Sequence, residues 1–302
     1  MARFAMVCAD GIGDALILEI ASHHLRLKGH EVVTFSHHLG GFGHWLPKTV
    51  CLPHPEKEEM DRVFGEFDAI VVQHDNTRRA QSILGLRTER EVYCLYTNYR
   101  LGKHGPMKKG YDFPFNESCS MVENIKMAAE KLLGVDASSG ANGLQVPDGL
   151  VHRKYEKRVA IHPTSAMKNK NWPKKKFLKV VNWLEKEGYE PVFVTSPKER
   201  AEWNSADLPT LADLASFLYE SGAFLGNDSG PGHLASYLKI PYLIIGRQEK
   251  QMKLWRPGWN PGTIITPPRW ILNLKGCRLR DEKWQLFISS KKVIKLLQKN
   301  VL

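Results

Sequence analysis

Apolar and polar residues alternate along the chain in a way that predicts strands and helices in succession. In the first half, short apolar runs predict strands at residues 4–8, 31–35, 67–73 and 92–96. Apolar residues at helical spacing predict helices at 15–28, 77–86 and 121–133. Gly29 and Gly134 directly follow two of these helices, a frequent position for glycine. This alternation indicates a parallel sheet with helices on both faces.

Residues 134–157 are rich in Gly, Ser, Asp and Pro, and we interpret them as a linker. The pattern then resumes, with predicted strands at 158–162, 191–195, 223–226 and 242–245 and predicted helices at 174–187, 210–220 and 234–238. We therefore expect an α/β protein with two doubly wound, Rossmann-like domains facing across a cleft, at 1–150 and 151–280. A basic amphipathic helix at 281–302 is expected to pack back toward the first domain.

Composition narrows the class of protein. The 302 residues are 42% hydrophobic and 25% charged, which is typical of a globular chain, and no apolar stretch approaches the ~20 residues of a membrane span. The first residues predict a buried strand rather than a secretory signal. The net charge of +11 indicates a polyanionic partner, but no nucleic-acid-binding motif is present. The chain has five scattered cysteines, Cys8, Cys51, Cys94, Cys119 and Cys277. Their odd number and wide spacing indicate a reducing cytoplasm and argue against disulfides or structural zinc.

The sequence Asn-Asp-Ser-Gly-Pro-Gly-His at residues 227–233 is the most informative motif. It lies between a predicted buried strand and a predicted helix. The first turn of such a helix presents unpaired N–H groups and the positive end of the helix dipole, so this junction is suited to binding an anion. An ordinary capped turn between a strand and a helix would explain the same residues.

Two further motifs each follow the predicted first strand of one of the two domains. Asp10-Gly-Ile-Gly-Asp14 contains a carboxylate, Asp14, that is either a favoured residue of the first helical turn or a functional group. It lacks the third glycine of a dinucleotide-binding fingerprint. His162-Pro-Thr-Ser165 is followed by Lys170-Asn-Trp-Pro, and the hydroxyls and the lysine are suited to phosphate oxygens. The topology predicts that Lys170 and residues 228–233 converge on one pyrophosphate, with Asp14 across the cleft.

Together, these motifs resemble glycosyltransferase family 9, the lipopolysaccharide heptosyltransferases. The segment Phe-Asp-Ala-Ile-Val-Val-Gln at 67–73, with Arg79 nearby, also resembles the Tyr-Asp-x-x-(Ile/Val)-Asp-Leu-Gln segment of this family. The resemblance implies a GT-B fold and transfer of a sugar, most often from ADP-heptose, to lipid A–Kdo or the inner core without a metal. It implies that Asp14 is the general base. The donor-binding residues it implies are Thr164, Ser165, Lys170, Asp213, Asp228, Ser229, Gly230, Pro231, Gly232 and His233.

Some positions depart from the family pattern. Gln73-His74-Asp75 replaces the usual end of its segment, and the acidic residue expected to bind the ribose aligns with Ala212, beside Asp213. The basic residues of the first domain either form an ordinary solvated surface or bind an anionic acceptor. We assign the acceptor site to Arg78, Arg79, Arg100 and Lys103, together with Gly13. No metal is expected, because the chain has no Asp-x-Asp triplet and neither His162 nor His233 has a third ligand at suitable spacing.

We therefore expect an inverting, metal-independent glycosyltransferase that moves a sugar, expected to be heptose, to a lipopolysaccharide core or lipid A-type acceptor. It would need no cofactor beyond the nucleotide-sugar co-substrate, expected to be ADP-heptose. The expected partners are this donor, an anionic lipid-linked glycan and transiently the inner membrane surface, not nucleic acid. We expect the protein in the cytoplasm, peripheral on the inner face of the inner membrane. Two alternatives are a sugar-nucleotide epimerase of the same fold and a non-catalytic glycan- or lipid-binding descendant.

Overall fold

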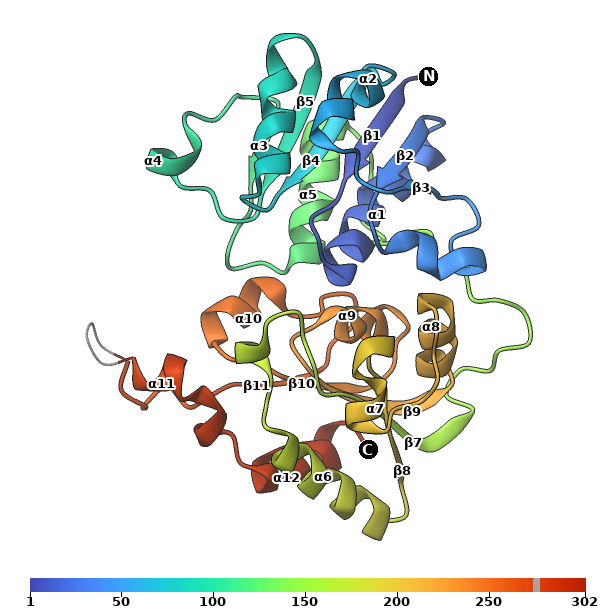
Figure 1. The fold of residues 1–302 in the computed structure, drawn as a ribbon, viewed down its shortest axis with the longest axis vertical. Helices are drawn as coiled ribbons and strands as arrows, with labels where there is room; N and C mark the ends of the chain where they lie inside the picture. Colours follow the sequence, from blue (N-terminus) through green and yellow to red (C-terminus); the bar gives the residue numbers. More distant parts are fainter. Residues whose placement is uncertain (274–277) are drawn as a thin grey trace. The chain divides into compact units, whose positions relative to one another are not determined.

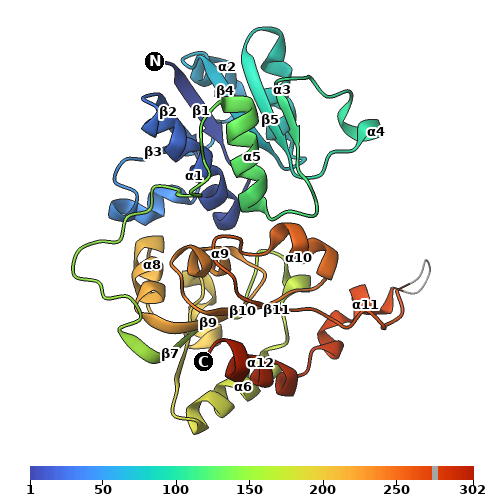
Figure 2. The same cartoon turned by 180° about the vertical axis from the view of Figure 1, so that it is seen from behind.

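The computed structural model describes residues 1–273 and 278–302 and divides into two compact units, Met1–Val146 and Pro147–Leu302 (Figure 1). In each unit, helices cover the faces of a parallel sheet, as the sequence predicts (Figures 1 and 2). No helix in the described ranges is long and apolar enough to cross a membrane. Four of the cysteines, Cys8, Cys51, Cys94 and Cys119, are free thiols, and Cys277 lies outside the described residues.

The first unit has a six-stranded sheet in the order β3-β2-β1-β4-β5-β6, and all its pairs are parallel. The strands are β1 (Arg3–Val7), β2 (Glu31–Phe35), β3 (Val50–Leu52), β4 (Ala69–His74), β5 (Glu91–Tyr96) and β6 (Asp112–Pro114). The helices are α1 (Ile12–Leu27), α2 (Met60–Phe64), α3 (Arg78–Gly85), α4 (Leu101–His104) and α5 (Met121–Leu133). The direction of winding reverses between β1 and β4, where ligands of open α/β sheets usually bind.

The buried strands explain why this unit folds as it does. All six side chains of β4 are buried, as expected for a central strand covered on both faces. Helices α2 and α3 pack on one face through Phe64 and Ile83, whereas α1 and α5 pack against each other. Helix α5 begins with a capping box formed by Ser120 and Glu123 and ends at Gly134, whose φ of 62° places it in the left-handed region.

Within the described residues, the second unit has a five-stranded parallel sheet in the order β11-β10-β9-β7-β8. The strands are β7 (Tyr155–His162), β8 (Glu190–Phe193), β9 (Ser221–Asn227), β10 (Tyr242–Ile245) and β11 (Thr263–Ile265). The helices are α6 (Lys174–Lys186), α7 (Arg200–Trp203), α8 (Leu211–Tyr219), α9 (Gly230–Tyr237), α10 (Glu249–Trp255), α11 (Leu279–Glu282) and α12 (Ser290–Asn300). Here the winding reverses between β7 and β9.

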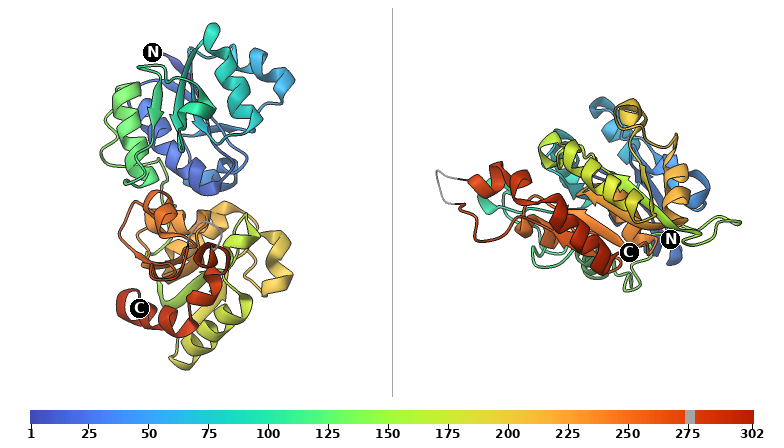
Figure 3. Two further views of the ribbon diagram at one scale, coloured as in Figure 1. Left: turned by 90° about the vertical axis from the view of Figure 1, so that its left-hand side faces the viewer. Right: turned by 90° about the horizontal axis from the view of Figure 1, so that it is seen from below.

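The C-terminal segment corrects one expectation. It forms α11, a short 3-10 helix at Trp284–Phe287 and α12, rather than one helix from residue 281. Helix α12 buries its apolar face against α6 of its own unit (Figure 3). Val293 and Leu297 lie there in the same core as Phe177 and Val180. The sequence analysis also missed β3, β6 and β11, which are three residues long and lie at sheet edges.

Candidate active site

At the switch point of the first unit, Asp14 and Gln73 come together. Asp14 lies in the first turn of α1, directly after β1, and Gln73 is part of the neighbouring strand β4. The Gln73 amide nitrogen donates to Asp14 Oδ1 at 3.4 Å, and its amide oxygen accepts from the backbone N–H of Ala9 at 3.2 Å. Because Gln73 is only 1% exposed, both bonds fix its amide. The result is a carboxylate oriented by a neutral donor.

The local backbone suits this arrangement. Gly11 caps α1 in an extended conformation, and a Cβ atom on it would lie 2.2 Å from Asp14 Oδ2. A larger residue at position 11 would therefore displace the carboxylate. Asp14 is only partly exposed and lies in the first turn of α1, at the positive end of the helix dipole.

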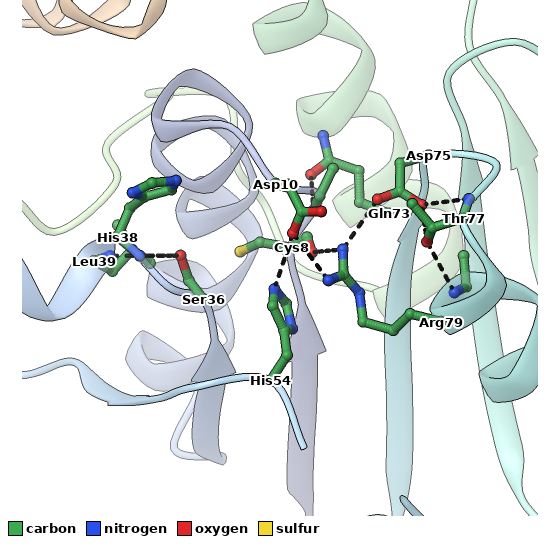
Figure 4. Close-up of polar contacts among 12 residues, drawn as sticks. Cys8, Asp10, Ser36, His38, Leu39, His54, Gln73, Asp75, Thr77 and Arg79 are labelled. Carbon is green, nitrogen blue, oxygen red and sulfur yellow. Dashed lines mark hydrogen bonds and ion pairs between the residues drawn. The ribbon is translucent and has the colours of Figure 1, made fainter. Parts of the chain in front are cut away.

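Arg79, on α3, is fixed by a network of its own (Figure 4). Its guanidinium donates to Asp10 Oδ1 at 2.9 Å, to Asp75 Oδ2 at 3.0 Å and to the carbonyl of Cys8 at 3.5 Å. Burial raises the pKa of Asp10, but the hydrogen bond and charge of Arg79 outweigh it, so the pKa is lowered overall. The neighbouring Arg78 is exposed and takes no part in these bonds.

The other proposed acceptor residues lie in different places. Gly13 is buried in the first turn of α1. Arg100 and Lys103 are exposed around α4, which follows β5. The last residue of α4, His104, bonds Asn76 after β4 through its Nε2 and the Asn76 Oδ1, 2.9 Å apart. The structure thus brings Gly13 and Arg79 to the switch point, whereas Arg100 and Lys103 lie on a separate exposed segment.

At the switch point of the second unit, Lys170 and Asp228 form an ion pair. Lys170 Nζ lies 3.0 Å from Asp228 Oδ2, and the two side chains are 22% and 11% exposed. Asn227, at the end of β9, holds the two loops together: its Oδ1 accepts from the Trp172 N–H at 3.1 Å and its Nδ2 donates to the Pro163 carbonyl. The predicted convergence of these motifs within the second unit therefore occurs.

Helix α9 begins at the same edge. Ser229 is its N-cap residue, and Gly230, Pro231 and Gly232 form its first turn. The Ser229 hydroxyl donates to the Asn227 carbonyl at 3.1 Å, so it does not cap the helix. Pro231 has no N–H, and a Cβ atom on Gly232 would lie 2.7 Å from the Ile244 side chain. Helix α9 therefore begins at this edge of the sheet, and the positive end of its dipole lies at the same edge.

His233 is buried in this first helical turn, 5% exposed. Within the described ranges, its Nδ1 has no hydrogen-bond partner. Its pKa is lowered to about 4, chiefly by burial; the charge of Asp228 opposes this shift and that of Lys170 adds to it. The imidazole is therefore neutral near pH 7.

The hydroxyl residues after β7 have partners within the site. Thr164 donates to Glu199 Oε2 at 3.2 Å, and Ser165 donates to Asn171 Oδ1 at 2.7 Å. Glu199 follows β8 and was missed by the sequence analysis, since nothing in its local pattern marks it. Asp213 forms a capping box with Thr210 at the start of α8. Its carboxylate is thus already used to cap that helix.

A family model for glycosyltransferase family 9 (heptosyltransferase) matches residues 107–261, just over half of the chain. The chain belongs to glycosyltransferase family 9. The match includes Lys170, Asp228 and His233 but not Asp14, which lies outside those residues. The family expected from the motifs is therefore confirmed.

Individual relatives agree with this assignment. The family 9 protein is 26% identical over 121 residues to Lipopolysaccharide heptosyltransferase 3 of Escherichia coli (strain K12), a match that covers 35% of each chain. Its fold is similar to that of the E. coli ADP-heptose lps heptosyltransferase II, with a TM-score of 0.68, 14% identity and 98% and 97% coverage. It is also similar to E. coli heptosyltransferase WaaC with ADP, with a TM-score of 0.66 and 12% sequence identity. This match covers 99% of the present chain and 100% of the WaaC chain. These likenesses confirm the expected GT-B fold class.

Proposed function

We propose that this family 9 protein is an inverting glycosyltransferase that moves a sugar from a nucleoside-diphosphate sugar to an acceptor hydroxyl. One observation carries this proposal: Lys170, Asp228 and the N-terminus of α9 meet at the switch point of the second unit. A lysine beside a helix N-terminus is a suitable environment for a diphosphate, because both contribute positive charge.

In the proposed reaction, Asp14 removes the proton from the acceptor hydroxyl, whose oxygen then attacks the anomeric carbon. The bond between that carbon and the diphosphate oxygen breaks, and its electron pair stays on the leaving nucleoside diphosphate. Lys170 and the start of α9 stabilise this charge, a role that requires no metal ion or other cofactor in the second unit. The bond from Gln73 to Asp14 supports the proposed role, since it orients the base without neutralising it.

The proposed donor is ADP-heptose and the proposed acceptor a lipopolysaccharide core or lipid A-type glycan. Two fold relatives support this choice by their descriptions, one as an ADP-heptose lps heptosyltransferase and one as a heptosyltransferase with ADP. The net charge of +11 is suited to an anionic, lipid-linked acceptor. An enzyme with this acceptor would act in the cytoplasm, on the inner face of the inner membrane.

Titration of the purified protein with ADP and with ADP-heptose tests the donor site. Lys170→Ala should weaken ADP binding by about 10- to 100-fold, since a charged hydrogen-bond donor is lost. Lys168→Ala is the matched control, because Lys168 is exposed in the same loop. Equal affinity of the Lys170→Ala variant and the wild type would contradict the donor site. Transfer of heptose to lipid A–Kdo, followed as ADP release, then tests the reaction.

A further inference from the structure

Three neighbouring strands of the first unit end in potential metal ligands. Asp10 follows β1, His37 follows β2 and His54 follows β3, and these strands are adjacent in the sheet. Backbone bonds continue past the strand ends, from the Cys8 N–H to the Phe35 carbonyl at 3.1 Å and from Ser36 to Leu52 at 2.8 Å. The three loops therefore leave the sheet side by side.

The side chains converge above this edge. One ligand atom from each of Asp10, His37 and His54 lies within 4.8 Å of the other two. Asp10 Oδ1 and His54 Nε2 are 3.8 Å apart, and the two imidazole rings meet edge to face with centroids 4.7 Å apart. Tetrahedral ligands about 2.1 Å from a metal lie about 3.4 Å from one another, so small side-chain rotations would complete the site.

The state of His54 is an independent observation that points to a ligand. Its side chain is 4% exposed, and neither ring nitrogen has a hydrogen-bond partner within the described part of the chain. A buried polar group left unpaired destabilises a protein by about 1–3 kcal/mol, so such groups usually have a partner.

The charges nearby favour a cation over an anion. Asp10 and Asp75 together outweigh the single positive charge of Arg79, which donates to both. Arg79 also fixes the Asp10 carboxylate from one side, while His54 approaches it from another (Figure 4). An anion bound between the imidazoles would instead face the Asp10 carboxylate. Hydrogen bonds to a ligating carboxylate are a common support of metal sites.

We propose that Asp10, His37 and His54 bind one divalent transition-metal ion such as Zn²⁺. Two imidazoles and one carboxylate are a ligand set that such ions accept, and three protein ligands leave a fourth position for water. This site is distinct from the donor residues, all of which belong to the second unit. It departs from the expectation of no metal because its ligands are far apart in the sequence and become neighbours only through strand order.

Zinc titration of the untagged, chelator-treated protein tests this site without any activity assay. The wild type should bind one Zn²⁺ per chain, and Co²⁺ in its place should give a visible absorption spectrum typical of histidine ligation. His37→Ala, His54→Gln and Asp10→Asn should each weaken Zn²⁺ binding at least tenfold. His38→Ala is the matched control. His38 is adjacent to His37, and its backbone N–H, which the substitution keeps, donates to the Ser36 hydroxyl.

The outcome is decisive in either direction. A tenfold or larger loss in the three variants, with an unchanged His38→Ala variant, supports the site. Absence of stoichiometric Zn²⁺ binding by the wild type, or an equal loss in His38→Ala, would overturn it. Circular dichroism of the metal-free variants checks their folding. If His54→Gln does not fold, His37→Ala carries the test, since His37 is exposed.

Discussion

The switch points of the two units use a carboxylate in opposite ways. In the first unit, a neutral amide donates to the carboxylate, from Gln73 to Asp14 at 3.4 Å. In the second, an ammonium group pairs with the carboxylate, Lys170 with Asp228 at 3.0 Å. The bond from Gln73 orients the Asp14 carboxylate, whereas the ion pair holds the Lys170 ammonium group at the sheet edge. The same architecture thus suits a base in one unit and an anion site in the other.

Substitution of Asp14 is the strongest test of this comparison. Asp14→Asn should lower the rate of sugar transfer by about 10²- to 10⁴-fold, the usual contribution of a general base. ADP binding should not change, because the proposed donor residues all belong to the second unit. Steady-state transfer kinetics and ADP titration measure the two effects. Asp61→Asn, on the exposed side of α2, is the control, and full activity of Asp14→Asn would remove the proposed base.

Substitution of Asn227 tests the switch point of the second unit. Asn227 is fully buried and bonds both the Trp172 N–H and the Pro163 carbonyl. Asn227→Ala leaves both groups unpaired and should lower the free energy of unfolding by about 3 kcal/mol. Urea unfolding followed by tryptophan fluorescence measures this loss. Asn169→Ala, exposed in the loop before Trp172, should change it by less than about 0.5 kcal/mol, and similar losses in both variants would contradict the bridging role.

The central elements could be predicted from sequence because their patterns are strong. The strands Glu31–Phe35 and Tyr242–Ile245 and the helix Met121–Leu133 have the predicted bounds. Edge strands such as β3 and β6 were missed, since three residues carry too little periodicity. The amphipathic pattern of the C-terminal segment predicted a helix but not its packing partner, which includes α6 of the same unit.

The sites show the same limit. Asp14, Lys170 and residues 227–233 could be singled out because each motif is local in the sequence. The partners Gln73 and Glu199 lie on other strands or loops, so only strand order brings them to Asp14 and Thr164. Local sequence therefore identifies the charged group, and strand order decides which neighbours bond to it.

The pH dependence of stability tests the buried environment of the second switch point. The His233 pKa is about 4 when folded and near 6.5 when unfolded. A lowered pKa means that the unfolded chain binds the proton first, so this stability is present above pH 6.5 and is lost as the pH falls toward 4. Between pH 7 and pH 5, His233 should account for about 2 kcal/mol of lost unfolding free energy.

His233→Gln should remove that part of the pH dependence. Urea unfolding at pH 7 and pH 5 measures it as the difference between variant and wild type, since other groups titrate in both. His44→Gln is the control because His44 is exposed in the first unit. Identical slopes for wild type and His233→Gln would mean that His233 is not held neutral by burial.

The smallest expected effect concerns the geometry of the first switch point. In Gly11→Ala, the new Cβ atom would overlap Asp14 Oδ2, 2.2 Å away, so the carboxylate must rotate from its bond with Gln73. A base displaced by this amount should lower the turnover number about tenfold, while the free energy of unfolding changes by about 1 kcal/mol or less. Gly85→Ala, where the added Cβ meets no atom within 4 Å, is the control and should leave transfer unchanged. Steady-state kinetics of both variants compare them. If Gly11→Ala keeps full turnover, the orientation of Asp14 by Gln73 does not matter to the reaction, and the contrast between the two carboxylates rests on charge alone.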